Sequence, residues 1–377
     1  MAKKQIIIIC GEASGDLHAG NLAKAIRQID PDIKISGVGG QVLRSFATEI
    51  YCDIKDLSVM GLFDVLKKLP AFFKLKKLIL KKIKSDKPDA IIFVDFSGFN
   101  LRLAKEINNS IPTIYYVSPQ VWASRQGRVE TIKKYISKMI VLFKFEQEFY
   151  KKHGLDVDFV GHPLLDIISP SMEIKELLNN LKFSASIKTI ALLPGSRKQE
   201  VKKILPIMLE ASRLINNELK CQFVIAKSPQ VNWEIYNRIR NISNLETKIV
   251  EGKAYDCLNI ADFALVASGT ATLETAIMQV PFFVIYKMGL LNYLLYRPQV
   301  KLPYIGMVNI VAGRKIIPEF IQFKACPKNI ADEALNILKD HSKLQEMQNN
   351  LAQIKSSLGE NGASLRAAQI ILNFLNK

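Results

Sequence analysis

The chain has 377 residues, of which 49% are hydrophobic, and its 52 Lys and Arg residues outnumber 35 Asp and Glu residues to give a net charge of +17. This length predicts two domains, and the charge favours an anionic partner such as nucleic acid, a membrane surface or a phosphorylated substrate. Five Cys residues stand without any CxxC pair, which argues against a zinc site or a disulfide framework. No apolar run is long and unbroken enough to predict a signal peptide or a spanning helix.

Short apolar strands alternate with helical patterns from the first residues onward. The predicted buried parallel strands of the first half are 6–10, 33–37, 90–94, 113–117, 138–142 and 157–160. After a polar pause, the strands predicted in the second half are 189–193, 221–226, 247–250, 263–267 and 282–286. This alternation predicts an α/β protein with two Rossmann-like parallel sheets.

The pause in this pattern predicts a domain boundary near Leu165. It gives an amino-terminal domain of residues 1–165, which we expect to bind acceptor and membrane, and a carboxyl-terminal domain of residues 166–357. A final amphipathic helix within residues 358–377 is expected to pack back on the first domain or on a partner subunit.

In doubly wound sheets, ligands bind beyond the carboxyl ends of the strands, so the loops that follow the strands are candidate sites. The first such loop contains Ser14, Gly15 and Asp16, which we expect to line a cleft, followed by His18. His18 is either a base or phosphate ligand, or part of a simple turn. Asp95 ends the strand 90–94 and is either a helix cap or a general base.

Residues 62–84 predict a basic amphipathic helix in which eight Lys residues accompany a single acid, Asp64. A helix of this kind suits a membrane interface, where each Lys near anionic lipid contributes on the order of 1 kcal/mol. An ordinary crossover helix with a solvated lysine face is the alternative. The apolar residues expected to contact the membrane are Leu62, Phe63, Leu66, Leu69, Phe72 and Phe73.

The segment 265–274 predicts a phosphate site, because an apolar strand stops at a small-residue turn and opens directly into a helix. The N–H groups of Ser268, Gly269 and Thr270 are then free to bind a diphosphate. Glu274 can accept hydrogen bonds from two sugar hydroxyls, although an ordinary helix cap with Glu274 on the solvent face is the alternative. Arg197, in the turn after strand 189–193, can reach the same diphosphate.

Five motifs resemble those of the lipid-A-disaccharide synthases, a family of inverting glycosyltransferases with the GT-B fold. In chain order they are GEASGD at 11–16, YYVSPQVWAS at 115–124, FVGHPLLD at 159–166, LLPGSR at 192–197 and ASGTATLE at 267–274. The resemblance implies a GT-B arrangement of two Rossmann-like domains facing across a cleft. It also implies transfer from UDP-2,3-diacylglucosamine to 2,3-diacylglucosamine 1-phosphate, forming a β(1→6) disaccharide and UDP.

The same resemblance implies roles for individual residues. Asp95 would be the base for the acceptor 6-hydroxyl, and Arg197, Glu274 and Asn309 would bind the donor, with Gln322 as a weaker addition. Some family members carry an apolar residue at the position of His18, so His18 is either a local substitution or a second base candidate.

The family resemblance also sets the expected partners and location. No metal or other cofactor is implied, and the chain would act in the cytoplasm as a peripheral protein of the inner membrane, with a homodimer allowed. The alternative within the same fold is another UDP-sugar-dependent transferase for a membrane lipid acceptor. A nucleic-acid-binding protein is disfavoured, because the lysines concentrate on one apolar helix and no RNP-like or helix-turn-helix pattern occurs.

Overall fold

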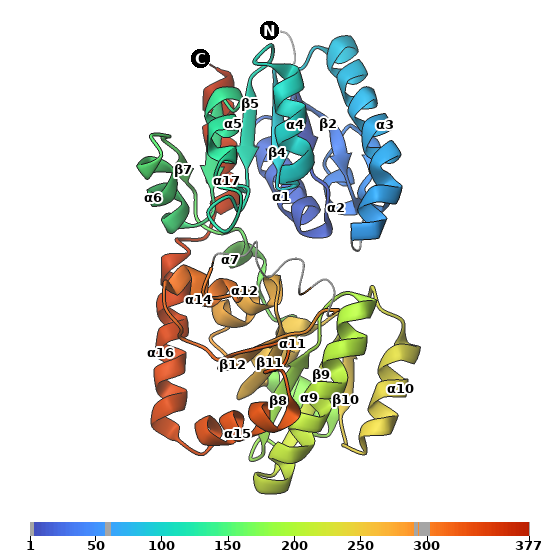
Figure 1. Cartoon of the computed structure of the whole chain (residues 1–377), viewed down its shortest axis with the longest axis vertical. Helices are drawn as coiled ribbons and strands as arrows, with labels where there is room; N and C mark the ends of the chain where they lie inside the picture. The colour runs from blue at the N-terminus through green and yellow to red at the C-terminus, as the bar shows by residue number, and fades with distance from the viewer. Residues whose placement is uncertain (1–3, 57–61, 290–292, 294–301, 377) are drawn as a thin grey trace. The chain divides into compact units, whose positions relative to one another are not determined.

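The computed structural model describes residues 4–56, 62–289, 293 and 302–376, with the side chains of residues 62–69 left out. The chain divides into two compact units. Unit 1 comprises residues 1–166 and 358–377, and unit 2 comprises residues 167–357. Each unit is built around one parallel sheet, which confirms the predicted α/β class with two Rossmann-like domains (Figure 1).

The sheet of unit 1 has the strand order β3-β2-β1-β4-β5-β6-β7, and every pair is parallel. Its strands are β1 (Gln5–Ile9), β2 (Lys34–Gly39), β3 (Glu49–Asp53), β4 (Ala90–Val94), β5 (Thr113–Tyr116), β6 (Lys138–Val141) and β7 (Asp158–Phe159). The β-branched residues of β1 and β4 are buried on both faces, as expected where helices cover both sides of a sheet. The edge strand β3 was not predicted from the sequence, since its residues are only partly buried and show no clear apolar run.

Helices connect and cover these strands. They are α1 (Ala13–Ile29), α2 (Gln41–Arg44), the 3₁₀ turn η1 (Ile54–Asp56), α3 (Leu62–Asp86), α4 (Ser97–Ile107), α5 (Arg128–Tyr135), α6 (Lys144–Lys152), α7 (Leu164–Ile167) and the terminal α17 (Ala363–Leu375). Helix α17 packs along α1, and the Arg366 guanidinium donates two hydrogen bonds of 2.9 and 2.7 Å to the Val160 carbonyl. The end of the chain is therefore an integral layer of unit 1.

Unit 2 contains a second parallel sheet with the order β10-β9-β8-β11-β12-β13. Its strands are β8 (Lys188–Leu193), β9 (Cys221–Lys227), β10 (Lys248–Glu251), β11 (Phe263–Ala267), β12 (Phe282–Tyr286) and β13 (Glu319–Ile321). Its helices are α8 (Ile174–Leu181), α9 (Lys198–Glu218), α10 (Trp233–Ser243), α11 (Ala254–Asn259), α12 (Thr270–Ile277), α14 (Met307–Ala312), α15 (Pro327–Leu338) and α16 (His341–Ser357). Strand β13 was missed from the sequence because three residues are too few to show a period.

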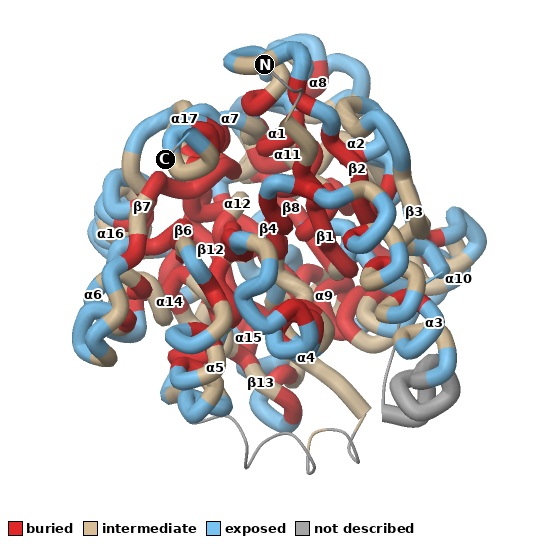
Figure 2. The backbone as a smooth tube through the Cα atoms, turned by 90° about the horizontal axis from the view of Figure 1, so that it is seen from above, coloured by how far each residue is buried: buried red, intermediate tan, exposed pale blue. Residues whose placement is uncertain are grey.

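Burial follows this layering. Most residues of the strands in both sheets are buried, whereas the helices alternate between buried and exposed residues (Figure 2). Among the helices in the described ranges, none combines the length and the hydropathy that a membrane crossing requires. The strand order in each unit places the loops singled out in the sequence at the carboxyl edge of a sheet.

Candidate active site

Asp95 occupies a strained turn at the carboxyl end of β4. Asp95 and Phe96 have φ angles of 49° and 50°, a left-handed conformation that costs a non-glycine residue about 1–3 kcal/mol. The Asp95 carbonyl accepts hydrogen bonds from the Tyr115 hydroxyl and, at 2.8 Å, from the Asn100 amide. Burial, with a smaller contribution from the charge of Glu12, raises the pKa of the Asp95 carboxyl to about 6. A carboxylate with such a pKa suits proton abstraction near neutral pH.

The loop after β1 lies directly against this turn. A Cβ atom placed on Gly11 would come within 2.3 Å of the Phe96 ring, and one on Gly15 would lie 3.9 Å from the Asp95 Cβ atom. The predicted loop residue Gly15 is therefore a neighbour of Asp95, whereas Ser14 is exposed at the start of α1. Glu12 in this loop, which the sequence analysis did not single out, is exposed. Its charge contributes to the raised pKa of Asp95.

The Asp16 side chain, which we expect to line a cleft, bonds the loop after β2. Its carboxylate is buried and accepts hydrogen bonds from the N–H groups of Gly40 at 2.6 Å, Val42 at 3.0 Å and Leu43 at 3.2 Å. Asp16 thus satisfies the free amide groups at the start of α2, which otherwise lack intrahelical partners. Its role is to hold the loop after β2.

His18 lies within α1 and faces a second histidine. The His18 and His162 rings are 5.9 Å apart in an edge-on arrangement, and His18 Nδ1 is buried without a hydrogen-bond partner in the described part of the chain. Burial lowers the pKa of His18 to about 4, and burial together with the charge of His18 lowers that of His162 to about 3. Both rings are therefore neutral near pH 7, and Asp95 is the stronger base of the two candidates.

A buried carboxyl group that the sequence analysis missed stabilises the neighbouring loops. Glu146 accepts hydrogen bonds from the Trp122 indole at 3.0 Å and from the N–H groups of Leu142 and Phe143 at 3.3 and 3.2 Å. Burial raises the pKa of Glu146 to about 7. The Phe143 ring lies 5.1 Å from that of His162, so this cluster also packs against the histidine pair. The position of Glu146 in the first turn of α6 was the available sequence signal, since Glu often caps there.

In unit 2, Arg197 stands at the start of α9, after β8. Gly195 in the same turn has a φ angle of 105°, a conformation that favours glycine. Glu200 accepts a hydrogen bond of 3.3 Å from the Arg197 N–H group and forms an ion pair of 3.5 Å with its guanidinium. The Arg197 side chain remains 55% exposed, so its outward donors are accessible to an anionic ligand.

The turn from β11 into α12 presents backbone N–H groups to solvent. Gly269 has a φ angle of 153°, and a Cβ atom placed on it would meet no atom within 4 Å. Gly269 and Thr270 are exposed, and no hydrogen bond from their N–H groups occurs within the described residues. The Ser268 N–H group instead donates to the Ile285 carbonyl at 3.0 Å, so the expectation of a free Ser268 amide is wrong.

Glu274 lies in the same helix, on the side that faces α11. Its Oε1 atom accepts a hydrogen bond of 3.2 Å from the Tyr255 hydroxyl, and burial raises the pKa of its carboxyl. A carboxylate offers about four acceptor positions. One partner therefore leaves enough capacity for a pair of sugar hydroxyls, as the sequence predicts.

Asn309 and Gln322, which we expect to bind a donor, have side chains that are hydrogen-bonded within unit 2. Asn309 is fully buried and donates to the Ile317 carbonyl at 2.9 Å and to Glu319 at 2.8 Å, while its oxygen accepts from the Ile317 N–H at 3.1 Å. Gln322 is buried and bonds both the N–H and the carbonyl of Met288, at 3.1 and 3.2 Å. Asn309 thus holds the segment before β13, and Gln322 holds the loop that follows β12.

The predicted membrane helix is only partly described. The side chains of Leu62, Phe63, Leu66 and Leu69 lie outside the described residues. Phe72 is half-buried, with ring centroids 5.9 Å from Phe96 and 6.3 Å from Phe99, so it connects α3 with the turn that follows Asp95. Phe73 is 59% exposed, and the Lys76 ammonium lies 5.7 Å from its ring. Of the two aromatic residues, Phe73 is the one available to a membrane.

Comparisons with known proteins point to one family. The family model described as lipid-A-disaccharide synthetase matches residues 6–374. The chain is 39% identical to a lipid-A-disaccharide synthase of Syntrophus aciditrophicus (strain SB), covering 100% of this chain and 99% of that protein. It is 35% identical to one of Coxiella burnetii (strain CbuG_Q212), over 100% of both chains. The crystal structure of the calicheamicin glycosyltransferase CalG4 matches with a TM-score of 0.61 at 13% identity, covering 100% of this chain and 99% of that one, which shows a shared fold.

Proposed function

The chain belongs to the lipid-A-disaccharide synthase family, and we propose on that basis that it joins two acylated glucosamines. It is a glycosyltransferase of lipid A biosynthesis that uses a UDP-sugar and a lipid-linked acceptor. The proposed donor is UDP-2,3-diacylglucosamine, and the proposed acceptor is 2,3-diacylglucosamine 1-phosphate. The family match over nearly the full length of the chain is the observation that carries this proposal.

The proposed role of unit 2 is to bind the UDP leaving group. The exposed N–H groups of Gly269 and Thr270 stand at the start of α12, where the helix dipole is equivalent to about half an elementary positive charge. Together with the guanidinium of Arg197, they would stabilise the charge that develops on the departing diphosphate. Glu274 would accept the two ribose hydroxyls.

The proposed role of unit 1 is to activate the acceptor. Asp95 would remove the proton of the acceptor 6-hydroxyl as that oxygen attacks the anomeric carbon of the donor. The attack and the departure of UDP occur on opposite faces of the sugar, so a single displacement inverts the anomeric configuration. The raised pKa of Asp95 favours this role, because a weakly acidic carboxyl is a more effective proton acceptor. The neutral His18 remains a second candidate for the same step.

We further propose that the protein binds peripherally to the cytoplasmic face of the inner membrane through α3. The exposed Phe73 offers apolar area, and the exposed Lys74, Lys77, Lys81 and Lys84 of the same helix offer positive charge to anionic lipids. Contact at this place would bring acylated substrates close to Asp95, because Phe72 of α3 packs against Phe96.

The decisive experiment offers the purified protein both proposed substrates and follows UDP release and the mass of the lipid product. We expect a product with the mass of the disaccharide 1-phosphate, formed only when both substrates are present. A parallel reaction offers UDP-N-acetylglucosamine with a cell-wall lipid intermediate as acceptor. Product in that reaction, and none in the first, would assign the chain to a different lipid glycosyltransferase activity.

A further inference from the structure

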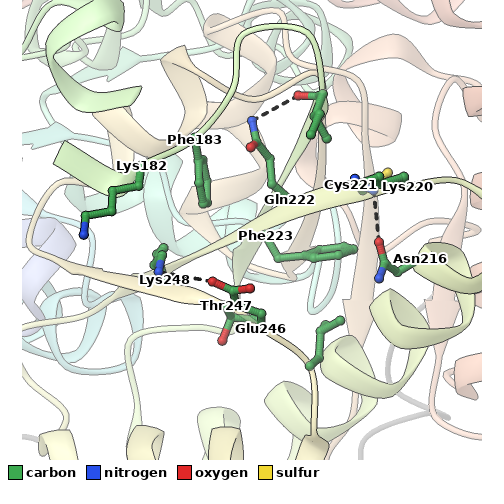
Figure 3. A pocket seen from close by; sticks show the side chains of 12 residues that line it. Lys182, Phe183, Asn216, Lys220, Cys221, Gln222, Phe223, Glu246, Thr247 and Lys248 are labelled. Carbon is green, nitrogen blue, oxygen red and sulfur yellow. Dashed lines mark hydrogen bonds and ion pairs between the residues drawn. The ribbon is translucent and has the colours of Figure 1, made fainter. Parts of the chain in front are cut away.

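Unit 2 contains a pocket at one edge of its sheet. This edge is opposite to the loops of the proposed UDP site, which contain Arg197 and Gly269. The pocket has a volume of about 280 Å³ and is lined by the first residues of β9 and β10 and by the segment before β8 (Figure 3). Because all strands of this sheet run parallel, their amino ends lie opposite to the carboxyl ends that precede Arg197 and Gly269. The pocket is therefore separate from the proposed UDP site.

The walls of this pocket are held in place by hydrogen bonds. The Gln222 amide group donates to the carbonyls of Ser184 at 2.8 Å and Ile187 at 3.0 Å. Asn216, in the last turn of α9, accepts a hydrogen bond of 3.0 Å from the Cys221 N–H group. These contacts fix the segment before β8 and the start of β9 before any ligand arrives, which lowers the entropic cost of binding.

Positive charge and aromatic rings meet in the pocket. Lys182, Lys220 and Lys248 line it, together with the rings of Phe183 and Phe223 (Figure 3). The acid that lines it, Glu246, pairs with Lys248 at 3.3 Å, and its side chain is 88% exposed. Two of the three lysines thus have no acid in the pocket lining to offset their charge.

Thr247 adds a hydroxyl group that lacks a partner. It lines the pocket, is 6% exposed, and its Oγ1 atom is buried with no hydrogen bond within the described residues. Because this Oγ1 atom is inaccessible to solvent, Thr247 forms part of the pocket wall, and a ligand would be recognised by the lysines and the aromatic rings.

We propose that this pocket binds a small amphipathic anion, in which a phosphate or carboxylate group is attached to a short aromatic or apolar body. The lysines would bind the anionic group, and the rings of Phe183 and Phe223 would contact the body. The volume lies just below the roughly 300–1,000 Å³ of drug-sized sites, so the ligand is smaller than either proposed lipid substrate.

Phenyl phosphate is a suitable probe, and its binding to the full chain can be followed by ligand-observed NMR and calorimetry. We expect a Kd of about 1 mM or lower, a typical value for a ligand of this size. Inorganic phosphate and benzyl alcohol each carry one half of the probe, and both should bind at least about tenfold more weakly. Saturating UDP should leave phenyl phosphate bound, whereas displacement by UDP would place the probe in the nucleotide site and overturn the proposal.

Charge reversal supplies the second test. Lys182 and Lys220 are exposed, so the double variant K182E/K220E should fold normally and bind phenyl phosphate at least about tenfold more weakly. The matched control K328E/K355E makes the same change of net charge at exposed lysines of α15 and α16, and it should bind like the unchanged protein. Equal affinity in both variants, or no binding to the unchanged protein at about 10 mM probe, would refute the site.

Discussion

The polar groups at the carboxyl edges of the two sheets differ in their exposure to solvent. In unit 1, the polar groups at this edge are withdrawn from water, so that burial raises the pKa of Asp95 and lowers those of His18 and His162. In unit 2, Arg197 and the N–H groups of Gly269 and Thr270 remain exposed. In the proposed function, burial would suit unit 1 to proton transfer, while exposure of charged and dipolar groups would suit unit 2 to binding an anion.

Replacing Asp95 with Asn should have the largest effect on turnover. Loss of a general base lowers the rate by about 10²–10⁴-fold, whereas UDP affinity should not change because Asp95 belongs to unit 1. Steady-state kinetics and calorimetry with UDP measure the two quantities separately. Asp89→Asn is a control, because Asp89 is an exposed aspartate just before β4. Collapse of UDP affinity in Asp95→Asn would make this residue a binding or folding group.

Replacing Arg197 with Ala should lower both turnover and UDP affinity. Loss of one charge-stabilising donor raises the barrier by about 2.7–4 kcal/mol, and UDP binding should weaken as well. Arg213→Ala is a matched control, since Arg213 lies in α9, the helix that Arg197 precedes, and also pairs with a glutamate three residues away, Glu210. Near-normal turnover in Arg197→Ala would remove this side chain from the mechanism.

The pH dependence of stability tests whether burial acts on Asp95 as described. Its pKa is raised from 3.8 to about 6, so the folded state holds a proton that the unfolded state releases, and stability falls as the pH rises through this range. Asp95→Asn removes that penalty. The variant should therefore be more stable than the unchanged protein near pH 7, by at most about 3 kcal/mol, and about equally stable near pH 4. Urea unfolding at both pH values measures the difference, and a variant that is less stable near pH 7 would contradict this explanation.

Asn309→Ala should destabilise unit 2 by about 2–3 kcal/mol, because the change removes the partner of buried backbone groups of Ile316 and Ile317 and one of the donors to Glu319. Urea unfolding again provides the measurement. Asn349→Ala, at an exposed position of α16, should change the stability by less than about 0.5 kcal/mol. If Asn309→Ala unfolds like the unchanged protein but binds UDP poorly, Asn309 contacts the ligand directly.

The smallest expected effect concerns membrane binding. Phe73→Ser should weaken binding to vesicles that contain anionic lipid by about 1–2 kcal/mol, since it removes an exposed ring from the proposed contact. Phe323→Ser is the control, because Phe323 is 74% exposed but belongs to unit 2. Vesicle sedimentation with both variants measures the difference, and equal losses would show that α3 is not the contact.

The sequence predicted most strands of the two sheets, but it did not predict the partners of several polar side chains. Apolar runs such as β4 and β11 report burial directly, so the strands and the loops that follow them were found correctly. Whether a polar side chain in such a loop faces a ligand or a backbone group depends on residues far along the chain. Asp16 bonds the amide of Gly40, 24 positions away, and no local pattern shows this contact.

The residues near the ends of β12 and β13 illustrate the same limit. Asn309 of α14 and Gln322 after β13 are polar residues in promising segments, but Glu319 and Met288 bond their side chains. Glu146 shows the opposite error, since nothing near it in the sequence indicates that it is buried. Its partner, the indole of Trp122, lies 24 positions away in the chain. Sequence position identifies the edge at which chemistry occurs, and the partners of each side chain determine its role.

A crystal structure of the protein with UDP bound would show directly which groups bind the nucleotide. We expect the diphosphate to accept hydrogen bonds from the N–H groups of Gly269 and Thr270 and from the Arg197 guanidinium, with the ribose hydroxyls on Glu274. Electron density for UDP at any other place, or a diphosphate without contact to the first turn of α12, would contradict this expectation.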